Sequence, residues 1–147
     1  MTELSPDSIL SHYRILSKIG AGGMGEVFNV HRYRRDYAAA IASLARAEEL
    51  KDDFEGAKLI KDSFAKDGWQ GFLQAATEER KRTKLSPYLI ATLYVEMGQH
   101  EKAFAALKET DEKRDQFISF LIIDPLLEPI RNDPRYQELL RKVGFPQ

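Results

Sequence analysis

The feature that most constrains the fold is a long series of apolar residues spaced three and four apart, which begins at Tyr37. In the first segment these residues are Tyr37, Ala40, Ile41, Leu44, Ala47 and Leu50, and in the next they are Phe54, Ala57, Ile60, Phe64 and Ala65. Such spacing places apolar side chains on one face of an α-helix. Gly68 is expected to end the second helix, and Trp69 to begin a third. The chain is therefore predicted to be all-α from about Tyr37 onward.

A pair of antiparallel helices is predicted on either side of Gly98. Ser86 is placed to cap the first helix and Pro87 to occupy its first position. Gly98 supplies the stop, because glycine readily adopts the left-handed conformation that ends many helices. A tight turn at Gln99 and His100 then leads into the partner helix.

Two aspartate–proline pairs predict further helices in the C-terminal tail. Asp124 and Pro125 open a short helix that extends to about Arg131. Asp133 and Pro134 open another that continues to about Val143, where Gly144 ends it. This last helix is expected to cap the helical array.

The N-terminal segment is expected to differ from the rest of the chain. Residues 1–12 resemble a flexible lead, and the runs Tyr13–Ile19 and Glu26–Val30 favour β-strands on either side of a glycine cluster. A single hairpin of this kind is marginally stable in water. The segment is therefore expected to be flexible or hairpin-like.

Composition excludes several classes of partner. The 147-residue chain carries 22 basic and 23 acidic side chains, so a strong field for nucleic acid or an anionic membrane is not expected. Cysteine is absent, which removes disulfides and thiolate metal sites. Neither a signal peptide nor an apolar run long enough to span a membrane is found, and a cytoplasmic protein is expected.

The order of residues around Gly98 resembles a tetratricopeptide repeat. Its carrying residues are Ala91, Tyr94, Gly98, Ala103 and Leu107, in which the small residues permit close helix approach and the large ones fill the space beside them. A weaker match places Phe64 and Gly68 one repeat earlier. The resemblance implies about two and a half helix pairs with a C-terminal capping helix over residues 36–147.

Residues 37–146 as a whole resemble the C-terminal tetratricopeptide region of bacterial serine/threonine kinases. The carrying segments are Asp67–Leu73, Leu85–Tyr94, Asp124–Tyr136 and Leu139–Pro146. Separately, Tyr13–Phe28 resembles the start of the catalytic domain of the same kinases. The chain thus resembles such a kinase with its middle removed, with residues 1–35 as a glycine-loop remnant.

The kinase resemblance implies a nucleotide site at Gly20, Gly22, Gly25 and Val27, if the loop still binds nucleotide. A kinase needs a strand lysine, a catalytic-loop aspartate and a metal-binding aspartate as well. Alanine stands in the place of the lysine, in the run Ala39–Ala42, and neither H-R-D nor D-F-G occurs in the chain. No catalytic residue and no cofactor are therefore expected. A residual ATP-binding or kinase-related role remains the alternative, and a gene remnant without a selected function is a third interpretation.

Other candidate chemistry is weaker. The histidines His12, His31 and His100 lie far apart and lack the spacing of metal ligands, so no metal is expected. Trp69 is interpreted as a packing residue, with the lining of a groove as the alternative. The favoured function is protein–protein interaction through stacked helix pairs.

The first helix of each pair would line the concave face of such an array and hold a protein or peptide. The candidate partner-binding residues on these helices are Lys58, Lys61, Tyr88, Thr92 and Glu96. Asp62 argues against a clamp for a carboxylate at the end of a partner chain. An apolar or mixed peptide surface around the last three residues is preferred.

The helix from Tyr37 to Leu50 exposes an apolar face that a preceding helix would cover in a complete repeat. Burial of a large apolar side chain is worth about 1.5–3 kcal/mol, so this face needs a cover. We expect Val27, Phe28 and Val30 to fold onto it. A homodimer, in which a second copy provides the cover, is the alternative.

Overall fold

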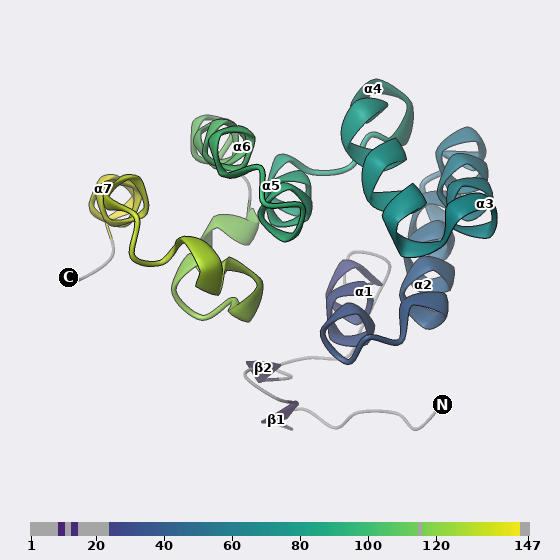
Figure 1. The fold of residues 1–147 in the computed structure, drawn as a ribbon, viewed down its shortest axis with the longest axis horizontal. Helices are drawn as coiled ribbons and strands as arrows, with labels where there is room; N and C mark the ends of the chain where they lie inside the picture. Colours follow the sequence, from purple (N-terminus) through teal and green to yellow (C-terminus); the bar gives the residue numbers. More distant parts are fainter. Residues whose placement is uncertain (1–8, 11–12, 15–23, 115, 145–147) are drawn as a thin grey trace. The chain divides into compact units, whose positions relative to one another are not determined.

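The computed structural model describes residues 9–10, 13–14, 24–114 and 116–144 (Figure 1). Apart from one short strand pair, the regular elements in these ranges are helices, which confirms the all-α prediction. The chain divides into two compact units, Met1–Lys84 and Leu85–Gln147. The boundary expected after residue 35 falls between two helices that pack together within the first unit.

The first unit contains four helices in its described part: α1 (Met24–Tyr33), α2 (Tyr37–Leu50), α3 (Phe54–Glu78) and the single turn α4 (Arg80–Thr83). Each packs against the next along the chain. Asp36 and Asp53 cap α2 and α3 by accepting hydrogen bonds from the amides of Ala39 and Gly56, at 3.2 and 3.0 Å. The connections are short, with three residues between α1 and α2 and three between α2 and α3.

A kink divides α3 where the sequence predicted a helix end. Gly68 has φ +67° and ψ −154°, a conformation that side-chain-bearing residues rarely adopt. The backbone at Gly71 lies close to the carbonyl oxygen of Ser63. A Cβ atom added at Gly71 would be only 2.7 Å from that oxygen. The two halves of α3 are thus the two predicted helices, joined through the non-helical residues Asp67 and Gly68.

The predicted strand Glu26–Val30 is wrong, because this segment lies within α1. The side chains of Val27 and Phe28 are buried, and α1 packs against α2. The cover expected for the apolar face of α2 therefore comes from the same chain, as a helix rather than a strand. Tertiary burial has overridden the β-propensity of these residues.

Four aromatic rings from three helices form the centre of the first unit. Trp69 stacks on Tyr37 with ring centroids 4.4 Å apart, and its centroid lies 5.0 Å from that of Phe72. Phe28 lies 6.1 Å from both Trp69 and Phe72. These separations are typical of favourable aromatic pairs. The cluster joins α1, α2 and the second half of α3.

The other predicted strand, Tyr13–Ile19, is only partly within the described residues. Its first two residues form β2 (Tyr13–Arg14), which pairs antiparallel with β1 (Ile9–Leu10). The expected hairpin partner lies in α1 instead. Residues 15–23, including most of the glycine cluster, lie outside the described residues.

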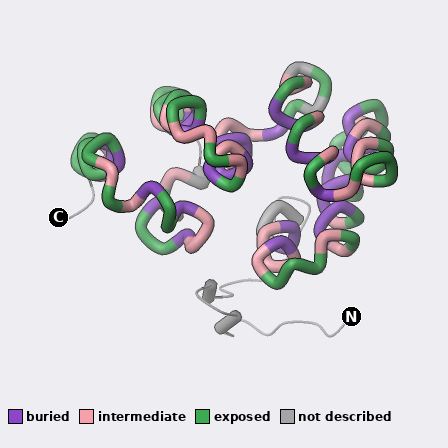
Figure 2. The backbone as a smooth tube through the Cα atoms, in the orientation of Figure 1, coloured by how far each residue is buried: buried purple, intermediate pink, exposed green. Residues whose placement is uncertain are grey.

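The second unit contains α5 (Pro87–Glu96), α6 (His100–Glu112), the 3₁₀ helices η2 (Gln116–Ile122) and η3 (Pro125–Ile130), and α7 (Pro134–Val143). The helices α5 and α6 pack together, η3 packs against α5, and α7 packs against α6. Figure 2 shows buried positions on both α5 and α6.

The predicted helix signals of this unit are confirmed. Ser86 and Asp133 accept hydrogen bonds from the amides of Leu89 and Arg135 at 3.2 and 2.9 Å. Gly98 and Gly144 adopt φ +76° and +96° at the helix ends. These signals are local in the sequence, which is why they could be predicted.

If α1 is part of the core, Phe28→Ala should strongly destabilise the first unit. Phe28 is fully buried, and replacement of a buried phenylalanine by alanine typically costs about 3–5 kcal/mol. Urea unfolding followed by the fluorescence of Trp69, the single tryptophan, measures the change. The matched control is Phe54→Ala, whose ring is 64% exposed and whose loss should change stability by less than about 0.5 kcal/mol. Equal effects of the two substitutions would contradict the helical cover.

Candidate functional site

The glycine-loop candidates that the structure describes do not form a kinase lid. Gly25 and Val27 belong to α1, and the Val27 side chain is buried. A kinase lid is a hairpin whose second strand would occupy this segment. Gly20 and Gly22 lie outside the described residues.

Two of the predicted partner-binding residues are part of the interior. Tyr88 is 3% exposed and donates a hydrogen bond to the Asp124 carboxylate at 2.7 Å. Thr92 is fully buried, and its hydroxyl donates to the carbonyl of Leu89 at 2.7 Å. The peptide surface expected around these side chains is therefore wrong, and of the three residues only Glu96 is exposed. The physical reason is η3, which packs against α5 and follows Asp124, the partner of Tyr88.

The other two candidates lie on one exposed face in the first half of α3. Lys58 and Lys61 have side chains that are 76% and 54% exposed. Phe54 and Ala65 are also exposed and share their face, because the four positions are separated by four, three and four residues. We call this set the α3 face. It combines one large aromatic ring with two cations.

Phe54 was missed as a surface residue because it continues the apolar spacing of the predicted helix. Ala57 and Ile60 from that same series are indeed buried, but Phe54 is 64% exposed. It follows the cap Asp53 and occupies the first position of α3. Leu50, at the end of α2, is 47% exposed as well. The cap at Asp53 was the available signal, because it places Phe54 at the edge of the helix.

The two cations of the α3 face already have carboxylate partners. Lys58 contacts Asp62 at 2.5 Å and Lys61 contacts Glu49 at 3.1 Å. The hydrogen bond from Lys61 lowers the pKa of Glu49 below its ordinary value. Exposed ion pairs of this kind contribute about 0–1 kcal/mol to stability. A partner's carboxylate can therefore replace either acid at small cost.

Trp69 is a packing residue, as the sequence predicted. Its side chain is 9% exposed, and the buried Arg32 guanidinium lies 5.9 Å from the ring centroid. A cation at this distance from an indole is attracted to the ring face. The ring faces that could hold a ligand are thus used within the protein.

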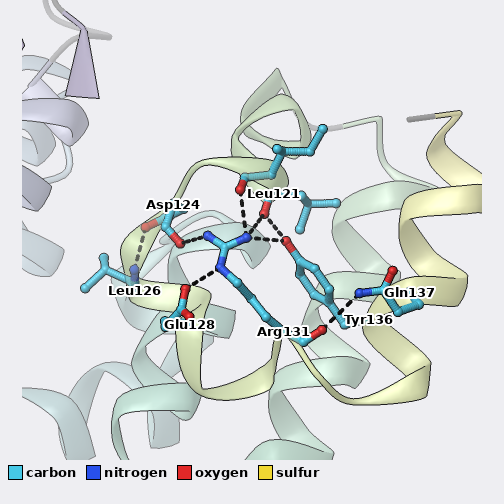
Figure 3. Close-up of polar contacts among 8 residues, drawn as sticks. Leu121, Asp124, Leu126, Glu128, Arg131, Tyr136 and Gln137 are labelled. Carbon is cyan, nitrogen blue, oxygen red and sulfur yellow. Dashed lines mark hydrogen bonds and ion pairs between the residues drawn. The ribbon is translucent and has the colours of Figure 1, made fainter. Parts of the chain in front are cut away.

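The segment Asp124–Tyr136, one of those that carry the resemblance to the kinase-associated region, forms a polar network centred on Arg131 (Figure 3). The guanidinium donates to the carbonyl oxygens of Ile122 and Asp124, both at 2.7 Å. It also donates to the Glu128 carboxylate at 2.6 Å and to the Tyr136 hydroxyl at 3.1 Å. One side chain thereby joins the end of η2, the start of η3 and α7. We interpret this network as structural.

Tyr136 and Asp124 complete the network from within the core. The Tyr136 hydroxyl donates to the Leu121 carbonyl, and burial raises the pKa of this phenol. Asp124 is 1% exposed and accepts hydrogen bonds from Tyr88 and from the Leu126 amide. A buried carboxylate is tolerated when donors surround it in this way. The hydrogen bonds of Tyr136 and Asp124 thus join the network to the core.

A second arginine fixes the start of α7 to α6. Arg135 contacts Glu101 at 2.7 Å and Asp133 at 2.9 Å, and its guanidinium lies 4.3 Å from the Phe104 ring centroid. Hydrogen bonds from Arg135 lower the pKa of Asp133 to about 2. The carboxylate is thus ionised at neutral pH, when it caps α7.

Within the described ranges, no cluster of three or more histidine, aspartate or glutamate side chains is arranged to hold a metal ion. None of the helices that the structure describes is long and apolar enough to cross a membrane.

Comparison with known proteins gives no relative: no family model, no curated protein and no solved structure matches the chain.

We expect Arg131→Met to destabilise the protein by about 3 kcal/mol. Two charge-assisted hydrogen bonds to main-chain carbonyls are lost, and each is worth about 1.5–3 kcal/mol. Chemical denaturation followed by far-ultraviolet circular dichroism measures the free energy of unfolding.

Lys142→Met is the matched control, because Lys142 is exposed and contacts only Asp111 among the ion pairs described, at 3.3 Å. Its loss should cost no more than about 1 kcal/mol. If Arg131→Met were as mild as this control, the network would not be what holds the tail together.

Proposed function

We propose that this chain is a non-catalytic protein-interaction module of the tetratricopeptide type, derived from a truncated bacterial serine/threonine kinase. The fold supports the proposal through its successive packed helices joined by short turns. Arrays of this kind present helix faces to peptides or other proteins. The residue order around Gly98 adds the resemblance to the repeat.

The α3 face is the observation that carries the proposal. An exposed Phe54 is a potential anchor, since aromatic side chains are frequent at the centres of binding surfaces. Lys58 and Lys61 lie one and two turns further along and supply positive charge. We assign to this face a peptide segment that carries an apolar side chain and acidic residues. Its carboxylates would take the places of Asp62 and Glu49.

Catalysis is not part of the proposed function. The residues that position and neutralise a phosphoryl group in kinases have no counterparts in the sequence. The helical conformation of Gly25 and Val27 also differs from the strand that a kinase lid requires. Interaction with a partner is the function that remains for the described surface.

Selection of peptides from a random library on the full chain tests the α3 face. Peptides that bind should contain acidic and apolar residues, and fluorescence anisotropy gives their dissociation constants. Phe54→Ser should weaken binding about 30-fold, which corresponds to the 2 kcal/mol of a typical hot spot. Lys58→Glu with Lys61→Glu should weaken binding and reduce its dependence on salt.

Ile123→Ser is the matched control for this experiment, because Ile123 is 48% exposed but lies in the second unit. It should leave the dissociation constant unchanged. Light scattering identifies a second copy of the chain as a competing occupant of the α3 face. The proposal fails if the selected peptides bind Phe54→Ser and the lysine double variant as tightly as the natural sequence.

Isothermal titration with ATP and magnesium tests the alternative function. We expect no saturable heat, because a kinase lid binds phosphates only with the rest of the catalytic domain beneath it. The control is the Gly22→Asp, Gly25→Asp variant. Saturable binding that this variant abolishes would show a nucleotide site and contradict the non-catalytic proposal.

A further inference from the structure

A buried carboxylate lies in the last turn of α2 and is used by neither proposed role. Glu48 is 2% exposed, whereas most glutamates are at the surface. The main chain closes the α2–α3 turn around this residue, because the amides of Lys51 and Asp53 both donate to the Glu48 carbonyl, at 3.1 and 2.9 Å. The turn therefore holds Glu48 close to Asp53.

Asp53 has one carboxylate oxygen in use and one without a donor. Its Oδ1 accepts the hydrogen bond from the Gly56 amide that caps α3. Its Oδ2 is buried and has no hydrogen-bond partner among the described residues. The Glu48 carboxyl group lies within hydrogen-bonding reach of Asp53. Two ionised carboxylates cannot bond to each other, since both only accept, but one proton between them supplies the missing donor.

The cations described nearby do not supply the donor that Asp53 Oδ2 lacks. Lys51, on the same turn, contacts Glu48 at 2.8 Å, but its own side chain is 59% exposed. From α3, Lys61 contacts the neighbouring Glu49. The basic residues His31 and Arg32 lie in the last turn of α1. That turn leads into the start of α2, whereas Glu48 lies at the other end of α2. Glu48 therefore has one exposed cation as its partner, and Asp53 Oδ2 has no donor among the described residues.

We propose that Glu48 and Asp53 share one proton across the α2–α3 turn, and that this makes the first unit a pH-sensitive element. In the protonated state the Glu48 hydroxyl donates to Asp53 Oδ2. As pH rises the proton passes to solvent, and two like charges remain close together, on the buried Glu48 side chain and the buried Asp53 Oδ2. The turn then loses a hydrogen bond and gains a repulsion.

The sign of the effect follows from the direction of the shift. Burial raises the pKa of Glu48 above its ordinary value of 4.5, and Asp53 adds to this rise while Lys51 opposes it. A group that binds its proton more tightly in the folded state contributes stability that is complete below the unfolded pKa. That contribution is lost as pH rises through the folded pKa. The first unit therefore loses this contribution as pH rises from the ordinary pKa of 4.5 through the raised pKa of Glu48.

Urea unfolding of the full chain, followed by Trp69 fluorescence from about pH 4.5 to about pH 8, tests the proposal. Trp69 belongs to the same unit as the turn. Glu48→Gln keeps the shape and offers a permanent N–H donor to Asp53. This variant should be more stable than the natural chain at the alkaline end, and the difference should shrink as pH falls. Each unit of pKa difference corresponds to a tenfold change in the unfolding equilibrium constant.

Glu49→Gln is the matched control, because Glu49 is the adjacent residue but its pKa is lowered rather than raised. Its stability should run parallel to that of the natural chain. Asp53→Asn keeps the cap oxygen and removes the second charge, so it should lower the pKa of Glu48, read from its carboxyl carbon by nuclear magnetic resonance. The proposal is overturned if Glu48→Gln runs parallel as well, or if Asp53→Asn leaves the Glu48 titration unchanged.

Discussion

The first unit depends on the meeting of Phe28, Tyr37, Trp69 and Phe72. These rings come from α1, α2 and the second half of α3, so no two consecutive helices suffice to form the cluster. Trp69 directly follows Gly68, at the kink that separates the two halves of α3, and its ring packs against rings from the other two helices. This cluster explains why the segment of α1 is helical, since the Phe28 side chain is buried only when the segment packs against α2 and α3.

The second unit is held in a different way, by polar groups as well as apolar ones. Arg131 binds the carbonyl oxygen of Ile122, the last residue of η2, and that of Asp124, which caps the start of η3. Arg135 joins α7 to α6 through Glu101 and the Phe104 ring. The repeated aspartate, proline and arginine residues of the tail therefore encode its shape. They account for the distinctive sequence of this segment without any ligand.

Local signals were predictable from the sequence, and contacts between distant segments were not. The caps at Ser86 and Asp133 act on amides two or three residues away, and the structure has both. The strand predicted at Glu26–Val30 failed because Phe28 is placed by Trp69, about forty residues further on. Tyr88 was taken for surface because its partner Asp124 lies in a segment whose packing on α5 no local pattern reveals. On the α3 face, Lys58 and Lys61 were predicted from the sequence, but Phe54 was missed because it fits the apolar spacing although it lies at a helix edge.

The position of Arg131 also bears on how the protein is made. The carbonyls of Ile122 and Asp124 leave the ribosome before the guanidinium that binds them, and Tyr136 follows later still. During synthesis η2 and η3 therefore exist for a time without the side chains that fix them. The tail of the second unit is completed only once Arg131 and Tyr136 have emerged, so a nascent chain that has not reached them exposes an unfinished surface to chaperones and proteases.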